Sequence, residues 1–298
     1  MRENTANILN ANTEESSALD FVMLLKPRVI SLVIFTGIIG MLLAPNTIHP
    51  VIALLAIVAI SIGSGAASAI NMWYDRDIDS IMTRTKTRPI PAGKVSPSEA
   101  LNLGITLSVL SVLIMAVFVN YLAALTLAFS IFFYAVIYTM YLKRSTVQNI
   151  VIGGAAGAFP PIIGWVSVTP SISIEPLLLF LIIFMWTPPH FWALSLHSSE
   201  EYRKANIPML PVIKGVKSTK DHIIAYFVVL FFTTLAPYYI GMFNTIYLIA
   251  TLILGIIFAL YIVLLVNEEK KYAMPCFKYS IIYLFLLFLS MIIDRSYG

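Results

Sequence analysis

Residues Val51–Ile70, with the sequence VIALLAIVAISIGSGAASAI, decide the fold because they include no charged side chain. A run of about 20 apolar residues is long enough to cross the hydrocarbon core of a membrane as a helix. The next residues, NMWYDRDID (Asn71–Asp79), contain three aspartates and one arginine. Carboxylates at the edge of a hydrocarbon layer are costly, so three of them at this place indicate a functional site rather than a plain connection.

The composition of the whole chain indicates a polytopic membrane protein. Its 298 residues are 59% hydrophobic and 11% charged, with a mean hydropathy of +0.88, whereas a soluble globular protein carries about 25% charged residues. The single cysteine, Cys276, excludes an internal disulfide and argues against a cysteine-ligated metal. We expect the lipid bilayer, and no nucleic acid, as a partner.

Nine apolar runs predict an all-α bundle of nine transmembrane helices. We expect residues 1–25 to form a flexible cytosolic tail and residues 26–298 to form a single transmembrane domain. The predicted spans are Val29–Leu43, Val51–Met72, Ala100–Val119, Leu122–Leu142, Val147–Val168, Ile174–Leu196, His222–Ile240, Tyr247–Val266 and Phe277–Ile293.

The basic residues lie almost entirely on one side of this predicted bundle. Of the 19 lysines and arginines, 18 fall in the tail or in the connections of one side, and only Arg295 falls on the other. The positive-inside rule places the N-terminus and these connections in the cytosol and the C-terminus outside, and we expect the bacterial inner membrane. Topology alone would explain the bases, but the same connections hold most of the acids, and two of them are longer than connectors need to be.

Asn71, Asp75 and Asp79 are spaced four residues apart, so on a helix their side chains lie on one stripe. Two carboxylates this close repel each other, and a hard divalent cation removes the repulsion. Mg²⁺ prefers oxygen ligands, often one or two carboxylates with substrate phosphates and waters. The stripe therefore predicts a Mg²⁺ site at the cytosolic end of the second span.

Three bases follow these acids in the segment RTKTRP, namely Arg84, Lys86 and Arg88. Guanidinium and ammonium groups suit phosphate oxygens, so acids followed by bases indicate a magnesium–diphosphate site. The simpler alternative is an ion-pair network at a helix end. Asp77 points off the stripe, and we expect it to pair with Arg76 or with a base of a loop.

A second cluster lies at the end of the sixth span, in WTPPHFWALSLHSSEEYRKANIPMLP. His190, His197 and Glu201 share one helical face if the helix continues that far. His190 follows Pro188 and Pro189, which we expect to disturb the helix. A buried histidine is more often a packing residue than a functional one. The expected disturbance of the helix and the acids beyond it give the packing and the functional interpretation equal weight here.

Charged residues near the second cluster extend the predicted site. Glu201, with Glu200 beside it, supplies a carboxylate for a second cation position. Lys143 and Arg144 end the fourth span on the same side and add positive charge there.

These stretches resemble the UbiA superfamily of intramembrane prenyltransferases, and within it the branch that farnesylates haem B. The resemblance covers most of residues 26–215 and no distinctive motif in the last three spans. The NxxxDxxxD pattern at Asn71–Asp79 marks the superfamily. The combination of KPRV, the DRDID…RT…RP block, PPHFWAL and ANIPMLPV marks the branch.

The resemblance implies roles for particular residues. Where the family's second motif usually has aspartate before tyrosine, this chain has Glu201 before Tyr202, which keeps a carboxylate but changes its reach. The implied metal ligands are Asn71, Asp75, Asp79 and Glu201; the implied diphosphate-binding residues are Arg84, Arg88, Lys143 and Arg144; and the implied catalytic residues are Asp75, Asp79 and His190, of which His190 also faces the acceptor.

The activity that the resemblance implies is transfer of the farnesyl group of farnesyl diphosphate to the 2-vinyl group of haem B. Water adds in the same reaction, and the products are haem O and diphosphate. Mg²⁺ is the implied cofactor, haem B is a substrate, and a haem A synthase or a terminal oxidase assembly is a further implied partner.

Two other functions remain open from the sequence. The acceptor of a UbiA-type enzyme can be another aromatic compound, such as 4-hydroxybenzoate or a quinone precursor, although PPHFWAL and ANIPMLPV favour the haem branch. A membrane transporter is the second alternative. Transporters usually place ionisable residues near the middle of the membrane, whereas here they lie at one face.

Overall fold

The computed structural model describes residues 16–297, and within that range it contains helices and connecting segments but no strand, so the predicted all-α fold is confirmed. Residues 1–15 of the expected flexible tail lie outside the described residues, and a short helix occupies part of the remainder. The elements are α1 (Ala18–Leu24), α2 (Pro27–Leu43), α3 (Pro50–Tyr74), α4 (Arg76–Ile81), α5 (Pro97–Phe118), α6 (Tyr121–Phe132), the π-helix η1 (Phe133–Leu142), α7 (Lys143–Ser145), α8 (Asn149–Gly153), α9 (Ala155–Val168), α10 (Ile174–His197), α11 (Ser199–Lys204), α12 (Leu210–Ile213), α13 (Gly215–Tyr239), α14 (Thr245–Asn267) and α15 (Glu269–Tyr297).

The number of spans agrees with the sequence prediction. Among the described residues, eight helices are long and apolar enough to cross a membrane, and a ninth span results if α1 and α2, bent by 53°, are counted together. Large apolar side chains such as Val117, Leu125 and Phe232 are mostly exposed, at 71%, 68% and 64%. Such surfaces suit contact with lipid, because the hydrocarbon core is as apolar as these side chains.

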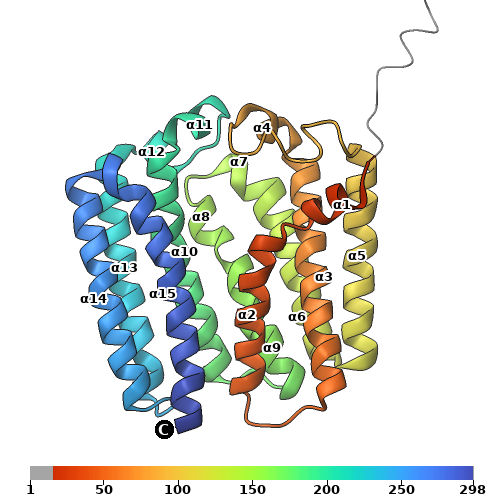
Figure 1. The fold of residues 1–298 in the computed structure, drawn as a ribbon, viewed down its shortest axis with the longest axis vertical. Coiled ribbons are helices and arrows are strands. Elements are labelled where there is room, and N and C mark those ends of the chain that lie inside the picture. Colours follow the sequence, from red (N-terminus) through yellow and green to blue (C-terminus); the bar gives the residue numbers. More distant parts are fainter. Residues whose placement is uncertain (1–15, 298) are drawn as a thin grey trace, which may run out of the picture.

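The two ends of the bundle differ in character. Figure 1 shows α1, α4, α7, α11 and α12 gathered at one end, while the C-terminus lies at the other. These short helices lie in the charged connections or beside them, so the predicted site residues outside the spans gather at one end. The long helices start at clear signals: proline occupies the first position of α2, α3 and α5, and Ser96 and Glu99 form a capping box at α5.

Close packing of α2 on α9 holds the middle of the bundle. A Cβ atom on Gly40 would lie 2.1 Å from the backbone oxygen of Pro161, and one on Gly164 would lie 2.0 Å from that of Gly37. No other residue type fits at these positions without moving the backbone. Small residues therefore allow the two helices to touch, as is common in membrane bundles.

The prediction that Pro188 and Pro189 disturb the sixth span is wrong. Helix α10 continues through both prolines to His197. Both prolines are buried, and α10 packs against α9, α13 and α15. Neighbouring helices can hold a proline-containing span in helical form even though the proline removes a backbone donor.

Candidate active site

The three residues of the first motif lie on one face of the helical path that α3 and α4 form together. Helix α3 ends at Tyr74, and Asp75 joins it to α4. The helical hydrogen bonds continue across this junction, from Asp75 N to Asn71 O at 2.9 Å and from Asp79 N to Asp75 O at 2.8 Å. Asn71, Asp75 and Asp79 are all buried, with 4%, 0% and 2% of their surface exposed. The structure therefore brings together the amide and the two carboxylates that the spacing placed on one stripe.

Three bases from two other segments, α7 and the loop after α4, neutralise these two carboxylates. Lys143 Nζ forms an ion pair with Asp75 Oδ2, and Arg144 Nη2 lies 3.4 Å from Asp75 Oδ1. Arg88 Nη1 donates to Asp79 Oδ2 at 2.7 Å. Buried charges persist in proteins when they are paired, because an uncompensated one is strongly destabilising. Three of the four bases predicted to bind diphosphate thus lie against the two predicted metal-binding aspartates.

Asp77 points away from this buried pair, as the stripe argument predicts. Its side chain is 61% exposed, and its two oxygens accept hydrogen bonds from Arg144 at 2.7 Å each. The Arg144 guanidinium holds the pKa of the Asp77 carboxyl below its usual value. The partner is therefore a loop base and not Arg76, which donates to the backbone oxygen of Trp73.

Two residues that the sequence argument did not single out fix the orientation of Asn71. Lys26 Nζ donates to Asn71 Oδ1 at 2.7 Å, while Asn71 Nδ2 donates to Asp75 Oδ2 at 2.7 Å and to Thr139 Oγ1 at 3.1 Å. Lys26 has a φ of +54°, a left-handed conformation that is unfavourable for a residue with a side chain. The only sequence signal for Lys26 is its place directly before Pro27, in KPRV.

Thr139 is brought to Asn71 by an irregular part of the fourth span. Residues Phe133–Leu142 form a π-helix, and Thr139 Oγ1 donates to the backbone oxygen of Tyr134 at 2.8 Å, five residues earlier. Such π-helical turns are rare in proteins, and those that occur are often found at functional sites. The π-helix ends directly before Lys143, so it also sets the position of the two bases that follow.

The second cluster lies on α11 and on the segments around it. Glu201 is half-buried, and among the described residues it makes no side-chain hydrogen bond or ion pair. Burial raises the pKa of the neighbouring Tyr202 phenol, whereas Arg84, close to its hydroxyl, and Arg88 act to lower it. Arg88 pairs with Asp79 and also acts electrostatically on Tyr202, so the two clusters lie near each other.

The remaining residues of the second cluster are not drawn into the site. His197 is exposed, and Glu200 pairs with Arg203 on the surface. Within residues 16–297, no group of three or more histidine, cysteine, aspartate or glutamate side chains is arranged to hold a metal ion. The two aspartates of the first motif and Glu201 therefore do not form one preassembled cage.

His190 is buried in α10 and is held between aromatic rings. Its ring centroid lies 4.1 Å from that of Trp186 and 4.5 Å from that of Phe277, and both rings stack on it. Its Nδ1 atom lies 2.6 Å from Ser280 Oγ. Ser280 belongs to α15, so the histidine is positioned by two helices that are distant in sequence.

The hydrogen bonds of Ser280 decide the tautomer of His190. The Ser280 hydroxyl lies 2.6 Å from the backbone oxygen of Phe277, which can only accept, so we assign the hydroxyl hydrogen to that bond and His190 Nδ1–H as the donor to Ser280 Oγ. The second ring nitrogen, Nε2, has no hydrogen-bond partner in the described part of the chain and keeps its lone pair. Sequence reasoning missed Ser280, because nothing in the last span marks it.

Two buried polar atoms beside the first motif have no hydrogen-bond partner among the described residues. They are Arg144 Nε and Asn149 Oδ1. The amide nitrogen of Asn149 donates to the backbone oxygens of Lys143 at 3.3 Å and Pro208 at 3.4 Å, which joins the first cluster to the loop after α11. Unpartnered buried polar atoms are uncommon and call for an explanation, such as a ligand that binds there.

This arrangement defines a class of protein. A membrane bundle with paired carboxylates and bases at one end, above an apolar interior, can hold an anionic headgroup at its surface and the attached hydrocarbon within. The sequence comparison agrees, since residues 33–291 match the UbiA prenyltransferase family. The chain belongs to that family.

Relatives and solved structures extend the comparison. The chain is 52% identical to "Protoheme IX farnesyltransferase" of Rickettsia bellii over 95% of each chain. It is 57% identical to the protein of that name from Ehrlichia canis, over 93% of this chain and 95% of the other. The structure of digeranylgeranylglyceryl phosphate synthase matches with a TM-score of 0.77 at 22% identity, covering 92% of this chain and 97% of that one. A UbiA homologue from Archaeoglobus fulgidus, bound to DMAPP and Mg²⁺, matches with a TM-score of 0.68 at 15% identity, covering 92% and 99%.

Proposed function

We propose that this protein transfers the farnesyl group of farnesyl diphosphate to the 2-vinyl group of haem B, with addition of water, to give haem O and diphosphate. The observation that carries the proposal is the pair of buried aspartates, Asp75 and Asp79, ringed by Arg88, Lys143 and Arg144 at the mouth of an apolar bundle. Relatives more than half identical over nearly the whole chain are named for this activity, which favours haem B over another aromatic acceptor.

The residues at the first motif fit a magnesium ion. Asp75 and Asp79 offer carboxylate oxygens and Asn71 offers an amide oxygen, and oxygen is the ligand type that Mg²⁺ prefers. Within residues 16–297, no three acidic, histidine or cysteine side chains are grouped to hold a metal ion, which suits an ion that takes phosphate oxygens and waters as its other ligands. We assign Asn71, Asp75, Asp79 and Glu201 as the residues that would hold it. When bound, Mg²⁺ supplies positive charge that stabilises the departing diphosphate.

The bases bind the diphosphate and favour its departure. Arg84, Arg88, Lys143 and Arg144 present guanidinium and ammonium groups at the same end of the bundle, and these groups suit phosphate oxygens. Arg144 Nε is buried and unpartnered, so it can donate to an anion without losing a bond to the protein. As the C1–O bond of farnesyl diphosphate breaks, the electron pair leaves with the diphosphate. Fixed positive charge placed where negative charge develops lowers that barrier.

The apolar interior protects the farnesyl cation. An allylic cation reacts with water, so the cavity that holds it must exclude water until the new bond forms. Aromatic rings in such an interior also stabilise a cation by their negative quadrupole. The electrons of the haem vinyl group form the new carbon–carbon bond. Water then adds to the resulting cation and releases a proton.

His190 is assigned to the acceptor. Its Nδ1–H is held by Ser280, which leaves Nε2 as an acceptor nitrogen, the form in which imidazole binds haem iron. We place Nε2 against haem B as the group that orients it. Catalytic roles therefore fall to Asp75 and Asp79 at the diphosphate and to His190 at the acceptor.

The cellular setting follows from charge and family. We place residues 26–298 in the bacterial inner membrane as one transmembrane prenyltransferase domain, with the charged connections in the cytosol and the C-terminus outside. A haem A synthase or a terminal oxidase assembly would receive the product. Farnesyl diphosphate reaches the site from the cytosol, where its charged headgroup meets the bases.

The proposal is tested by identifying which acceptor the protein prenylates. Purified protein in detergent is given farnesyl diphosphate, Mg²⁺ and an equal mixture of haem B and 4-hydroxybenzoate, and the products are separated on a reversed-phase column. We expect a haem of longer retention and no prenylated 4-hydroxybenzoate. Prenylation of the small ring with unchanged haem B would sink the proposal in favour of the other UbiA-type activity.

A further inference from the structure

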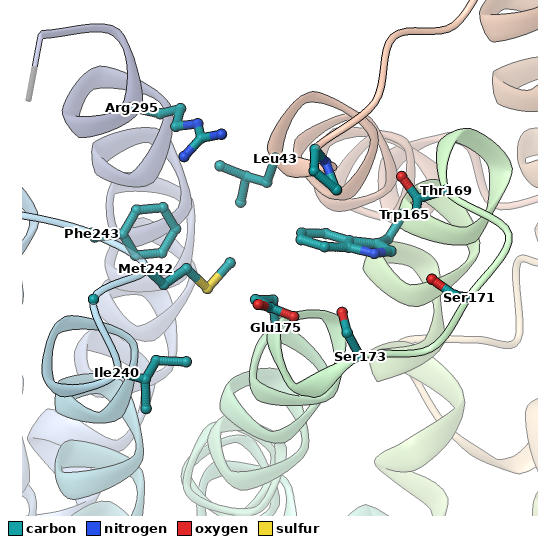
Figure 2. Close-up of a pocket in the computed structure, with 12 residues that line it drawn as sticks. Leu43, Trp165, Thr169, Ser171, Ser173, Glu175, Ile240, Met242, Phe243 and Arg295 are labelled. Carbon is teal, nitrogen blue, oxygen red and sulfur yellow. The ribbon is translucent and has the colours of Figure 1, made fainter.

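A polar pocket lies at the end of the bundle opposite the candidate active site. Its volume is about 400 Å³. Figure 2 shows its walls: the end of α2 at Leu43, the α9–α10 connection, the α13–α14 connection and Arg295 of α15. Trp165, Glu175 and Arg295 face one shared space from three different helices.

Unpartnered buried polar atoms gather in this pocket. Three of its lining residues contribute one each: Trp165 Nε1, Thr169 Oγ1 and Glu175 Oε2. Trp165 is only 4% exposed. Eight such atoms occur among the described residues, and the pocket holds three of them, one more than the candidate active site with Arg144 and Asn149. A concentration of unsatisfied donors and acceptors around one cavity indicates that something polar occupies it.

The pocket also holds two opposite charges that do not pair. Glu175 and Arg295 both line it, yet no ion pair within 4.0 Å joins them. The neighbour of Arg295, Asp294, is already used, because it accepts from the backbone N–H groups of Asn244 at 2.6 Å and Tyr247 at 3.0 Å. Arg295 is also the one base that the charge pattern places on this side of the membrane, so topology does not account for it.

The residues around the pocket place it at the level of lipid headgroups. Tyr239 and Tyr297 flank it in sequence and are 77% and 84% exposed, and exposed tyrosines are typical of the membrane–water interface. Ile240, which lines the pocket, is 49% exposed. The pocket is therefore open to polar groups that sit between hydrocarbon and water.

We propose that this pocket binds a phosphoethanolamine group, in the form of a phosphatidylethanolamine headgroup of the outer leaflet. The primary ammonium donates to Glu175, and the phosphate accepts from Arg295 and from Trp165 Nε1–H. This assignment satisfies both charges and two of the three unpartnered atoms. A choline headgroup has no N–H to donate to Glu175, and a glycerol headgroup has no positive charge, so both should bind less well.

Native mass spectrometry of the full-length protein tests the proposal. The detergent-solubilised protein is titrated with phosphatidylethanolamine, its N-methylated derivatives, phosphatidylcholine and phosphatidylglycerol of matched acyl chains. We expect one tightly bound phosphatidylethanolamine and an affinity about tenfold lower for phosphatidylcholine and phosphatidylglycerol, since one charge-assisted hydrogen bond contributes roughly that much. Soluble O-phosphoethanolamine forms a separate arm, and its failure to displace the lipid separates a lipid headgroup from a free zwitterion.

Variants locate the binding. E175Q and R295Q should each abolish the preference for phosphatidylethanolamine, whereas E268Q and K271Q, which remove an exposed charge pair at the other end of the bundle, should preserve it. Equal retention of all the lipids by the wild-type protein would overturn the proposal without reference to any variant. A preference that survives E175Q and R295Q, or retention of water alone, would overturn it too.

Discussion

Replacing Ser280 by alanine isolates the part of the site that faces the acceptor. The Ser280 hydroxyl accepts from His190 Nδ1–H at 2.6 Å and donates to the backbone oxygen of Phe277 at 2.6 Å. The substitution removes one oxygen atom and leaves the stacking of Trp186 and Phe277 on the imidazole in place. His190 then loses the one group in the described part of the chain that holds its proton on Nδ1.

The size of the effect follows from the burial of this bond. His190 is 6% exposed and Ser280 is fully buried, so the unpaired Nδ1–H costs about 1–3 kcal/mol. In the wild-type protein, this hydrogen bond favours the tautomer that carries the proton on Nδ1 and leaves Nε2 free. Without Ser280, the proton of His190 can move to Nε2. Loss of a residue that orients a metal-binding histidine lowers affinity or activity about 10- to 100-fold. We expect that loss in haem B affinity and in kcat/KM for haem B, with KM for farnesyl diphosphate unchanged.

The assay follows the Soret band of haem B as it is titrated into the protein, alongside turnover to haem O. S290A is the matched control, because Ser290 lies on the same helix, is 6% exposed and donates to a backbone oxygen three residues earlier, as Ser280 does. The control should keep the wild-type spectrum and affinity. If S280A and S290A bind haem B equally well, Ser280 does not set the histidine tautomer, and the assignment of His190 to the acceptor loses its structural basis.

Two further predictions concern the aspartates and the membrane topology. D75N and D79N should each lower turnover at least about 100-fold, because each change removes a buried carboxylate ligand and leaves bases unpaired. D77N, at an exposed aspartate, should lower turnover less than about tenfold. Equal losses in the three variants would refute the division into buried and exposed aspartates. For topology, S80C should react with an impermeant thiol reagent only in opened cells, whereas T47C should react in intact spheroplasts as well. The native Cys276 is buried and should not react. The opposite labelling would reverse the predicted orientation in the membrane.

Local sequence patterns were sufficient for the framework of the fold. Uncharged runs predicted the spans, and the spacing of four residues predicted that Asp75 and Asp79 share one face. That prediction succeeded because helical hydrogen bonds continue across the junction at Asp75. The arrangement of Arg88 against Asp79 was also within reach, since only nine residues separate them. Each of these features depends on short segments whose geometry the chain itself dictates.

Contacts between distant segments were not predictable in this way. Lys26 and Asn71 are 45 residues apart, Asn71 and Thr139 are 68 apart, and His190 and Ser280 are 90 apart. Their meeting depends on how nine helical segments pack, which no local pattern specifies. The same packing keeps α10 helical through Pro188 and Pro189, where local propensity alone predicts a break.

The most direct test of the central claim follows one oxygen atom. The purified protein is incubated with haem B, farnesyl diphosphate and Mg²⁺ in water enriched in heavy oxygen, and the extracted haem is analysed by mass spectrometry. The account predicts a haem that has gained one farnesyl group and one hydroxyl group carrying the heavy isotope, and at least about 100-fold slower formation of this product by D75N. Consumption of farnesyl diphosphate with unmodified haem B, or a farnesylated haem without the isotope, would contradict it.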